Sequence, residues 1–513
     1  MKDHTLIIQL GGAPVVDPTS LDAAFTFEVA EQPEAKLQSG EPLFAAHRLG
    51  EAYQQALMIL SAGSWAWDAE VIKQLPANRI LYAQHLALSP QLQALLALRG
   101  GIALDLKEPA AVSRLLNDDF FPMGSSGGGY ALDLDKIALV GSHPWQVLGN
   151  VKYRLSDDFG QAWQLVAQSR RALWVPPHAV NELRFESAAH GAQLQVRAQV
   201  VASNRTHAQL KSAVAEQTTK QPLMIAGGAH GVHVQLFFYA RGFGTVEIGS
   251  VRVARSRGSY GAFELNGQRL SAESDLYTYF EAGDMHPPLT VYFAGYREAP
   301  GFEGKHMMRA LHGPFLLIAD GRLEGGAFYL GDSQVIAQLV GVIRDTLHRL
   351  GFASDQLILT GLSMGTYGAL YYARYLKPRA VVIGKPLIHL GTIAANGKLV
   401  RPEDFATAKD CLLYYQNSLS AEAIAALNAR FDENFLAGDY QQTTFAIAYM
   451  QNDDYDATAF VTLRDWLKTR WPKARLLAKG LVGRHNDDTN GIVTWFVTQL
   501  RHQIQLIQQE AQS

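Results

Sequence analysis

Short apolar runs alternate with longer amphipathic stretches through the last half of the chain. The runs PLTVYFAGY, FLLIAD, QLILTG, AVVIGKP, TTFAIAYM and ARLLAKGL are nearly continuous, which is typical of strands buried on both faces of a parallel sheet. The stretches between them, such as SQVIAQLVGVIRDTLHRLG and GTYGALYYARYL, repeat apolar residues at helical spacing. We therefore predict an α/β domain over residues 275–513, with a doubly wound and mostly parallel sheet.

The first part of the chain, residues 1–125, shows a shorter version of this alternation. We expect strands in TLIIQLGG, RILYAQH and IALDL, and helices in EAYQQALMILS and SPQLQALLALRG. This pattern predicts a small α/β region with a parallel sheet. The region lacks a G-x-G-x-x-G turn, so we do not interpret it as a nucleotide site.

Between these two regions, residues 131–270 change to a period of two. Polar and apolar residues alternate in AQLQVRAQVVAS and VHVQLFFYARGFGTVEIGS, which indicates an antiparallel β-sandwich. Trp145, Trp163 and Trp174 either bind carbohydrate there or belong to the core. The run MGSSGGGY at residues 123–130 lacks the lysine of a phosphate-binding loop, and we interpret it as a boundary between domains.

The composition narrows the functions that this layout can serve. The 513 residues are 48% hydrophobic, and Lys+Arg 45 nearly balance Asp+Glu 48, which argues against a broad nucleic-acid surface. Cys411 is the single cysteine, so an intrachain disulfide and a multi-cysteine metal site are excluded. The N-terminus does not resemble a secretory signal, and no apolar run is long enough to span a membrane. We expect a cytoplasmic protein without a metal site.

One junction between a strand and a helix carries the clearest chemical signal. Residues 357–376 read LILTGLSMGTYGALYYARYL, in which G-x-S-x-G follows a predicted strand and opens a predicted helix. Gly361 and Gly365 permit a sharp turn that exposes Ser363 above the sheet. A small residue in a structural turn is the alternative, but the strand before it and the helix after it favour a nucleophile.

The same junction predicts donors for an oxyanion hole. The Met364 amide opens the helix on the side of the serine. A second donor in this fold comes from the loop after an earlier strand, and VYFAGYREAPGFEG is that loop here. We expect backbone groups near Ala294, Gly295 and Tyr296 to supply it.

An acid and a base follow the serine in the chain order of α/β-hydrolases. The turn QNDDYD, directly after the strand TTFAIAYM, offers Asp453 as the acid with Asp454 as the alternative, whereas Asp456 suits a helix cap. His485 lies in the polar loop GRHND between the last predicted strand and the last predicted helix, where the base belongs. These residues predict acyl transfer through Ser363 to water or to another hydroxyl group.

These motifs resemble a known family. VYFAGYREAPGFEG, GLSMGTYGALYYA, AYMQNDDYDA and GRHND, in a chain of this length and layout, are similar to the α/β-hydrolase-like component among the accessory Sec system Asp proteins of Gram-positive bacteria. The resemblance spans the whole chain, but only its last half carries specific motifs. In relatives the acid can be a glutamate, whereas this turn holds aspartates, so Asp453 and Asp454 both stay open.

The resemblance implies an α/β-hydrolase domain, a carbohydrate-binding sandwich, and Ser363, Asp453 and His485 as a catalytic triad. It implies O-acetyltransferase activity on N-acetylglucosamine of serine-rich-repeat glycoprotein adhesins during their export. The implied partners are two sister Asp proteins, an accessory SecA motor ATPase and the glycoprotein, with peripheral association at the translocon. We expect no bound cofactor, and the residues do not name the acetyl donor. The alternatives are a carbohydrate esterase or deacetylase, and a non-catalytic scaffold that binds the glycoprotein.

Overall fold

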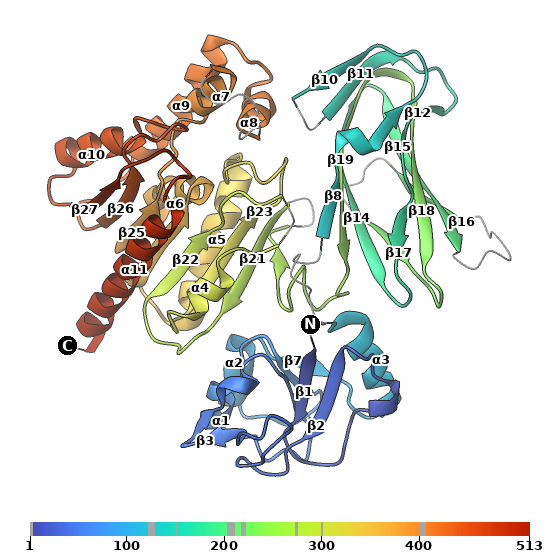
Figure 1. The fold of residues 1–513 in the computed structure, drawn as a ribbon, viewed down its shortest axis with the longest axis vertical. Coiled ribbons are helices and arrows are strands. Elements are labelled where there is room, and N and C mark those ends of the chain that lie inside the picture. The colour runs from blue at the N-terminus through green and yellow to red at the C-terminus, as the bar shows by residue number, and fades with distance from the viewer. Residues whose placement is uncertain are drawn as a thin grey trace.

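The computed structural model describes residues 4–121, 129–149, 152–202, 211–216, 222–271, 275–298, 301–399 and 407–512. Its main sheets form three bodies: a small parallel sheet near the N-terminus, a two-sheet sandwich, and a large mixed sheet that ends with the C-terminal helix (Figure 1). Most of the predicted boundary at 123–130 lies outside the described residues.

The first sheet is parallel, with strand order β2-β1-β5-β6-β7. Its strands are β1 (Thr5–Gln9), β2 (Phe25–Val29), β5 (Leu57–Leu60), β6 (Ile80–Ala83) and β7 (Ile102–Leu104). The helices of this body are α1 (Ala69–Gln74), α2 (Pro90–Leu98) and α3 (Pro109–Asp119), with short pieces η1 (Pro18–Ser20), η2 (Glu51–Tyr53), β3 (Phe44–Ala45) and β4 (Arg48–Leu49).

The helix expected in EAYQQALMILS is wrong, because the segment forms one short turn and then strand β5. All four residues of β5 are buried, and they divide between two hydrophobic clusters on opposite faces of the sheet. An apolar run that is buried on both faces has no polar side, so its periodicity does not separate a central strand from a buried helix.

The sandwich consists of two antiparallel six-stranded sheets with a core between them. One sheet has the order β10-β11-β19-β14-β17 with β8 beside β19, and the other has the order β16-β15-β18-β12-β9 with β13 beside β18. The strands are β8 (Gly129–Leu132), β9 (Ile137–Leu139), β10 (Trp145–Leu148), β11 (Lys152–Asp158), β12 (Gln164–Ser169), β13 (Leu173–Val175), β14 (Val180–His190), β15 (Gln193–Ala202), β16 (Lys211–Glu216), β17 (Leu223–Ala226), β18 (Val232–Arg241) and β19 (Phe243–Arg255), and η3 (Leu134–Lys136) is a short turn.

The large sheet has the order β20-β21-β23-β22-β24-β25-β26-β27 and confirms the predicted doubly wound α/β fold. Its strands are β20 (Gln268–Arg269), β21 (Leu276–Glu281), β22 (Leu289–Phe293), β23 (Phe315–Asp320), β24 (Leu357–Leu362), β25 (Ala380–Gly384), β26 (Thr444–Met450) and β27 (Arg475–Leu481). The six strands from β23 to β27 along this order pair in parallel, and the edge strands β20 and β21 pair antiparallel.

Helices cover both faces of the large sheet. α4 (Lys305–Arg309) and α11 (Thr489–Gln512) pack into the core of one face. The other face carries α5 (Ser333–Leu350), α6 (Met364–Leu376), α9 (Ala421–Leu436) and α10 (Ala459–Arg470), and the remaining elements are η4 (Ser354–Gln356), α7 (Leu390–Leu399) and α8 (Thr407–Gln416). Among the described helices, none combines the length and the apolar character that a membrane crossing requires.

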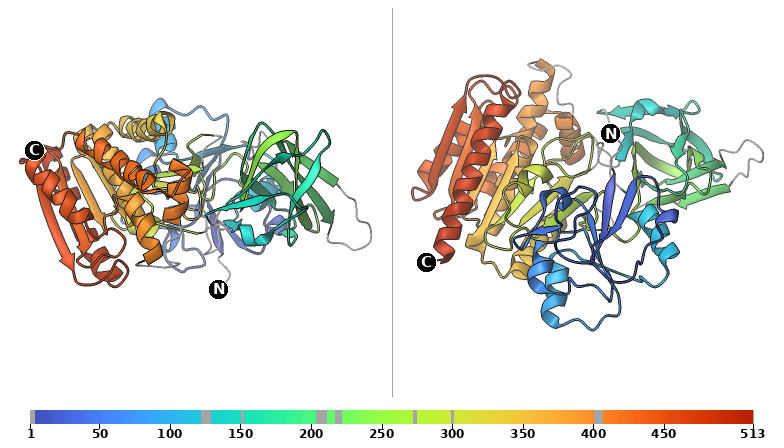
Figure 2. Two further views of the ribbon diagram at one scale, coloured as in Figure 1. Left: turned by 90° about the horizontal axis from the view of Figure 1, so that it is seen from above. Right: turned by 60° about the horizontal axis from the view of Figure 1, so that its bottom comes forward.

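Charged contacts fix the sandwich against the large sheet, and Figure 2 shows these two bodies side by side in further views. Arg252 on β19 forms an ion pair with Asp275 at 2.6 Å and donates a hydrogen bond to the Leu323 carbonyl at 3.1 Å. Asn266 donates to the Gly100 carbonyl at 2.7 Å and thereby contacts the N-terminal body. Arg252 is buried, and its contacts join the sandwich to the large sheet.

Candidate active site

Ser363 occupies the sharp turn between β24 and α6. Its backbone has φ 50° and ψ −118°, a combination that residues other than glycine rarely adopt. A Cβ at Gly365 would lie 2.0 Å from the Phe293 carbonyl oxygen, and one at Gly361 would lie 2.5 Å from the backbone of Gly365. Only glycine therefore fits at the two flanking positions, which let the chain turn while the serine stays at the apex.

The structure brings Ser363, His485 and Asp453 into one hydrogen-bonded chain. Ser363 Oγ lies 2.9 Å from His485 Nε2, and His485 Nδ1 lies 2.8 Å from Asp453 Oδ2. When Nδ1 donates its hydrogen to the carboxylate, Nε2 is left to accept the serine proton. The geometry is that of a nucleophile, a general base and an orienting acid, although the three residues come from three different loops.

The two neighbouring aspartates have different contacts. Asp453 Oδ1 accepts hydrogen bonds from the amides of Tyr455 and Asp456 at 2.9 and 3.2 Å, while its other oxygen faces the imidazole. Asp454 instead accepts the backbone amide of His485 at 3.0 Å. Asp453 therefore contacts the imidazole ring, and Asp454 fixes the backbone of the loop that carries His485.

Asp456 was expected to cap the following helix, and this expectation is wrong. The N-cap of α10 is Thr458, which makes no capping bond with its side chain. Asp456 Oδ2 accepts the amides of Ile388 and His389 at 2.9 Å each, so it ties the turn after β26 to the loop after β25.

Burial sets the protonation of the histidine and the acid. His485 is 1% exposed, and burial lowers its pKa below the ordinary value, although the bond to Asp453 opposes this. Burial alone would raise the pKa of Asp453, but its hydrogen bonds with His485 and with the amides of Tyr455 and Asp456 lower it. A neutral imidazole and an ionised carboxylate at neutral pH are the states that a general base and its partner require.

The predicted oxyanion donors differ in what they already bind. The Met364 amide is the first of α6, and the opening amides of a helix have no partner within the helix. The expectation for the Ala294 amide is wrong, because it donates to the Ile318 carbonyl at 2.9 Å within the sheet. The Gly295 amide also has a partner already, because it donates to Glu303 Oε2 at 2.5 Å. Tyr296 lines the cavity beside the serine.

Two charged residues in this cavity were missed in the sequence. The cavity has a volume of about 260 Å³, and both Glu303 and Lys385 line it together with Ser363. Burial raises the pKa of the Glu303 carboxyl and lowers the pKa of the Lys385 amine, which lies 3.4 Å from Thr489 Oγ1. Lys385 directly follows β25, so the rule that ligands bind beyond the carboxyl ends of parallel strands could have found it.

This arrangement suits nucleophilic acyl transfer. The base can take the serine proton, the acid can hold the resulting imidazolium, and the start of α6 presents amides to an oxyanion. Within the described ranges, no group of three or more His, Cys, Asp and Glu side chains could hold a metal ion.

Comparisons with known proteins place the chain in a family. The family model described as "Accessory Sec system GspB-transporter" matches residues 55–511. The second of the accessory Sec system Asp proteins of Staphylococcus aureus is 41% identical over 353 residues, which are 68% of this chain and 67% of that protein. The corresponding accessory Sec system protein of Streptococcus gordonii is 44% identical over 260 residues, which are 50% of this chain and 51% of that protein.

A solved structure extends this similarity over the whole fold. A chain of the Glycosylation Associate Protein (Gap123) complex from Streptococcus agalactiae superimposes with a TM-score of 0.80 at 28% identity, and the match covers 98% of each chain. The family model covers most of the sequence, and this superposition includes all three bodies. The chain therefore belongs to the GspB-transporter family of accessory Sec system Asp proteins, the family of its Staphylococcus aureus and Streptococcus gordonii relatives.

Proposed function

We propose that this protein is a serine acyltransferase that modifies a glycan on an exported glycoprotein while it serves in an accessory Sec system. Ser363 Oγ attacks the carbonyl of an acetyl ester as His485 takes its proton, and the leaving alcohol receives that proton from the imidazolium. A sugar hydroxyl then gives its proton to His485 and attacks the acetyl group on Ser363, which restores the serine. The acceptor that we propose is N-acetylglucosamine of a serine-rich-repeat glycoprotein.

The observation that carries this proposal is the hydrogen-bonded chain of Ser363, His485 and Asp453 on a strained turn. A strained backbone persists only where its surroundings hold it, and here Ser363 N donates to the Gly384 carbonyl at 2.9 Å. A structural turn has no need of a buried histidine within hydrogen-bond reach of the serine. No resident cofactor is required, because the serine itself carries the acyl group between donor and acceptor.

Hydrolysis of a small activated ester tests the nucleophile. The purified protein should release p-nitrophenol from p-nitrophenyl acetate and form an acetyl adduct that mass spectrometry detects. Ser363→Ala should abolish both, and Ser354→Ala, which alters an exposed serine on η4, should retain both. Full hydrolysis by Ser363→Ala would remove the basis of the proposal.

The direction of the reaction on the glycan distinguishes a transferase from an esterase or deacetylase. The glycoprotein isolated from cells that carry Ser363→Ala should have lost acetyl groups if the protein transfers them. A gain of acetyl groups in the same cells would identify hydrolysis instead.

A role as an export scaffold is the second candidate, and the size of the part outside the catalytic sheet favours it. The N-terminal body and the sandwich together hold the strands from β1 to β19. The Streptococcus agalactiae relative was solved as a complex, so we propose that this chain also assembles with sister accessory Sec proteins. We further propose that it acts in the cytoplasm, peripherally at the translocon, with a SecA motor ATPase. Export that survives Ser363→Ala but fails without the sister proteins would favour the scaffold.

A further inference from the structure

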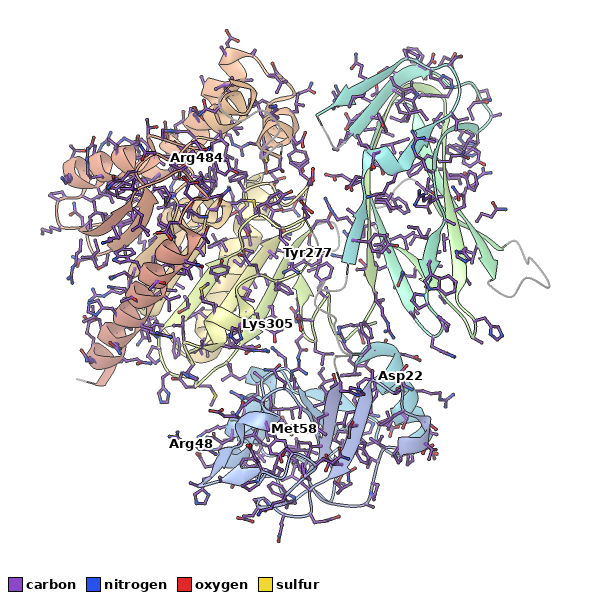
Figure 3. The ribbon with its side chains drawn as sticks, viewed as in Figure 1. Asp22, Arg48, Met58, Tyr277, Lys305 and Arg484 are labelled. Atoms are coloured by element: carbon purple, nitrogen blue, oxygen red, sulfur yellow. The ribbon has the colours of Figure 1, made fainter. Side chains whose placement is uncertain are left out.

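Three cavities between the sandwich and the serine share lining residues. The cavity at Ser363 shares Gly295 with a second cavity of about 270 Å³, which lies between β8 and β19 of the sandwich and the loops after β22 and β23. The second cavity shares Tyr130 with a groove of about 510 Å³ on the sandwich, where Trp174 also lies. Tyr277 lines the middle cavity, and Figure 3 shows it at the edge of the large sheet that faces the sandwich.

Exposed aromatic side chains are concentrated along these cavities. Among the described residues, five aromatic side chains are exposed, and three of them line the cavities: Tyr296 (38%), Tyr130 (43%) and Trp174 (40%). An exposed aromatic ring with a polar end offers a flat apolar face while its N–H or O–H stays in contact with polar groups. Sugar rings present this combination of an apolar C–H face and a rim of hydroxyl groups.

The charge of the middle cavity selects among ligands. Arg297, Glu298 and Glu324 line it, and three further charged residues of its wall form ion pairs, Asp133 with Lys136, Arg252 with Asp275 and Asp320 with Arg322. An excess of carboxylates disfavours phosphates and other anions, and carboxylate oxygens accept hydrogen bonds from hydroxyl groups. The wall of the middle cavity therefore fits a neutral polyhydroxyl ligand better than an anionic one, whereas the groove at Trp174 carries Lys136, Arg170 and Arg171 besides Asp135.

The wall between the serine cavity and the middle cavity is closely packed. Gly325 lines the middle cavity, and a Cβ built on it would lie 2.1 Å from the ring of Tyr296, so the ring packs directly on this glycine. Arg252 fixes the opposite side through its contacts with Asp275 and Leu323. The three cavities are therefore lined by residues of both bodies, and Arg252 joins these bodies beside them.

We propose that these three cavities form one binding path for an oligosaccharide of neutral sugars, which delivers a terminal hydroxyl group to Ser363. Trp174 and Tyr130 stack on successive sugar rings, and Glu298 and Glu324 accept their hydroxyl hydrogens. This inference rests on the proposed acyl transfer to a glycan, and it adds the class of acceptor, a chain of sugars rather than a single sugar, and the residues that select it.

Acetyl transfer from p-nitrophenyl acetate to N-acetylglucosamine or to its linear tetramer tests the path. The acetylated sugar is measured by mass spectrometry as the sugar concentration rises, and p-nitrophenol release is followed in parallel. The tetramer should half-saturate at a concentration about tenfold lower than the monosaccharide, because it also reaches the aromatic rings.

Single substitutions then locate the contacts. Trp174→Ala and Tyr130→Ala should each remove most of the tetramer's advantage, and Glu298→Gln should raise the half-saturating concentration of both sugars. Phe243→Ala is the matched control, since it removes an exposed aromatic ring of the same sandwich that lies off the path. Equal half-saturation by tetramer and monosaccharide, or equal effects of Tyr130→Ala and Phe243→Ala, would overturn the inference.

Direct binding separates this inference from the proposed function. Calorimetric titration of Ser363→Ala with the tetramer needs no catalysis, and the affinity should fall in the combined variant with Tyr130→Ala. If p-nitrophenol release fails but this binding pattern holds, the acyl transfer is wrong and the path stands. If release depends on Ser363 but the tetramer does not bind, the path is wrong and the nucleophile stands.

Discussion

The backbone amide of Gly295 donates its hydrogen to the carboxylate of Glu303, at a distance of 2.5 Å. Both residues line the cavity of Ser363, and this bond fixes the orientation of the peptide at the start of the loop that follows β22. This contact therefore holds the start of the loop in place beside the serine cavity.

Glu303 should therefore act as a positioning residue. Glu303→Ala removes the acceptor and should lower kcat for p-nitrophenyl acetate by about 10- to 100-fold with little change in KM. Glu303→Gln keeps an oxygen that can accept the amide hydrogen and should retain most of the activity. Higher activity in both variants would mean that the carboxylate obstructs the oxyanion position instead.

Asp453 and Asp454 should differ sharply in their effect on turnover. Asp453→Asn replaces the group that accepts the Nδ1 hydrogen of His485 and should reduce kcat by about 10⁴-fold. Asp454→Asn keeps an oxygen that can accept the hydrogen of the His485 amide, and it should reduce kcat by less than about tenfold. Steady-state kinetics on the same ester measure both, and similar losses in the two variants would contradict these roles.

The pH dependence should follow the lowered pKa of His485. Only the neutral imidazole acts as a base, so a lowered pKa keeps kcat/KM high to a pH below the ordinary histidine value of about 6.5. Lys385 lowers this pKa further and Asp453 raises it. Lys385→Met should therefore move the acid limb to higher pH, and Asp453→Asn should move it to lower pH. Movement in the opposite direction in either variant would show that another group controls the limb.

The glycines of the turn should be needed for folding as well as for catalysis. Gly365→Ala places a Cβ 2.0 Å from the Phe293 carbonyl oxygen, so the free energy of unfolding should fall by about 1–3 kcal/mol or more, with loss of activity. Gly341→Ala is the matched control, because its Cβ meets nothing within 4 Å in the middle of α5, and it should be stabilising by up to about 1 kcal/mol. Urea unfolding measures both, and a neutral Gly365→Ala would contradict the close packing of the turn.

The sequence determined much of the large domain and part of its site. Continuous apolar runs predict its central strands, because strands buried on both faces have no polar side. The turn around Ser363 was readable because two flanking glycines, a strand and a helix must occur together in a local stretch of chain. Asp453, Asp454 and His485 were readable as candidates because each lies in a loop directly after a predicted strand.

Other features were decided by tertiary contacts between distant segments. The strand at Leu57–Leu60 resembled a helix until its two buried faces were known. The different roles of Asp453 and Asp454 depend on which carboxylate faces the ring of His485. The two residues are adjacent in the chain, so the hydrophobic pattern does not distinguish them. Glu303, Lys385 and the cavities shared with the sandwich are visible only after folding, because side-chain directions and the packing of separate bodies are not written in any local pattern.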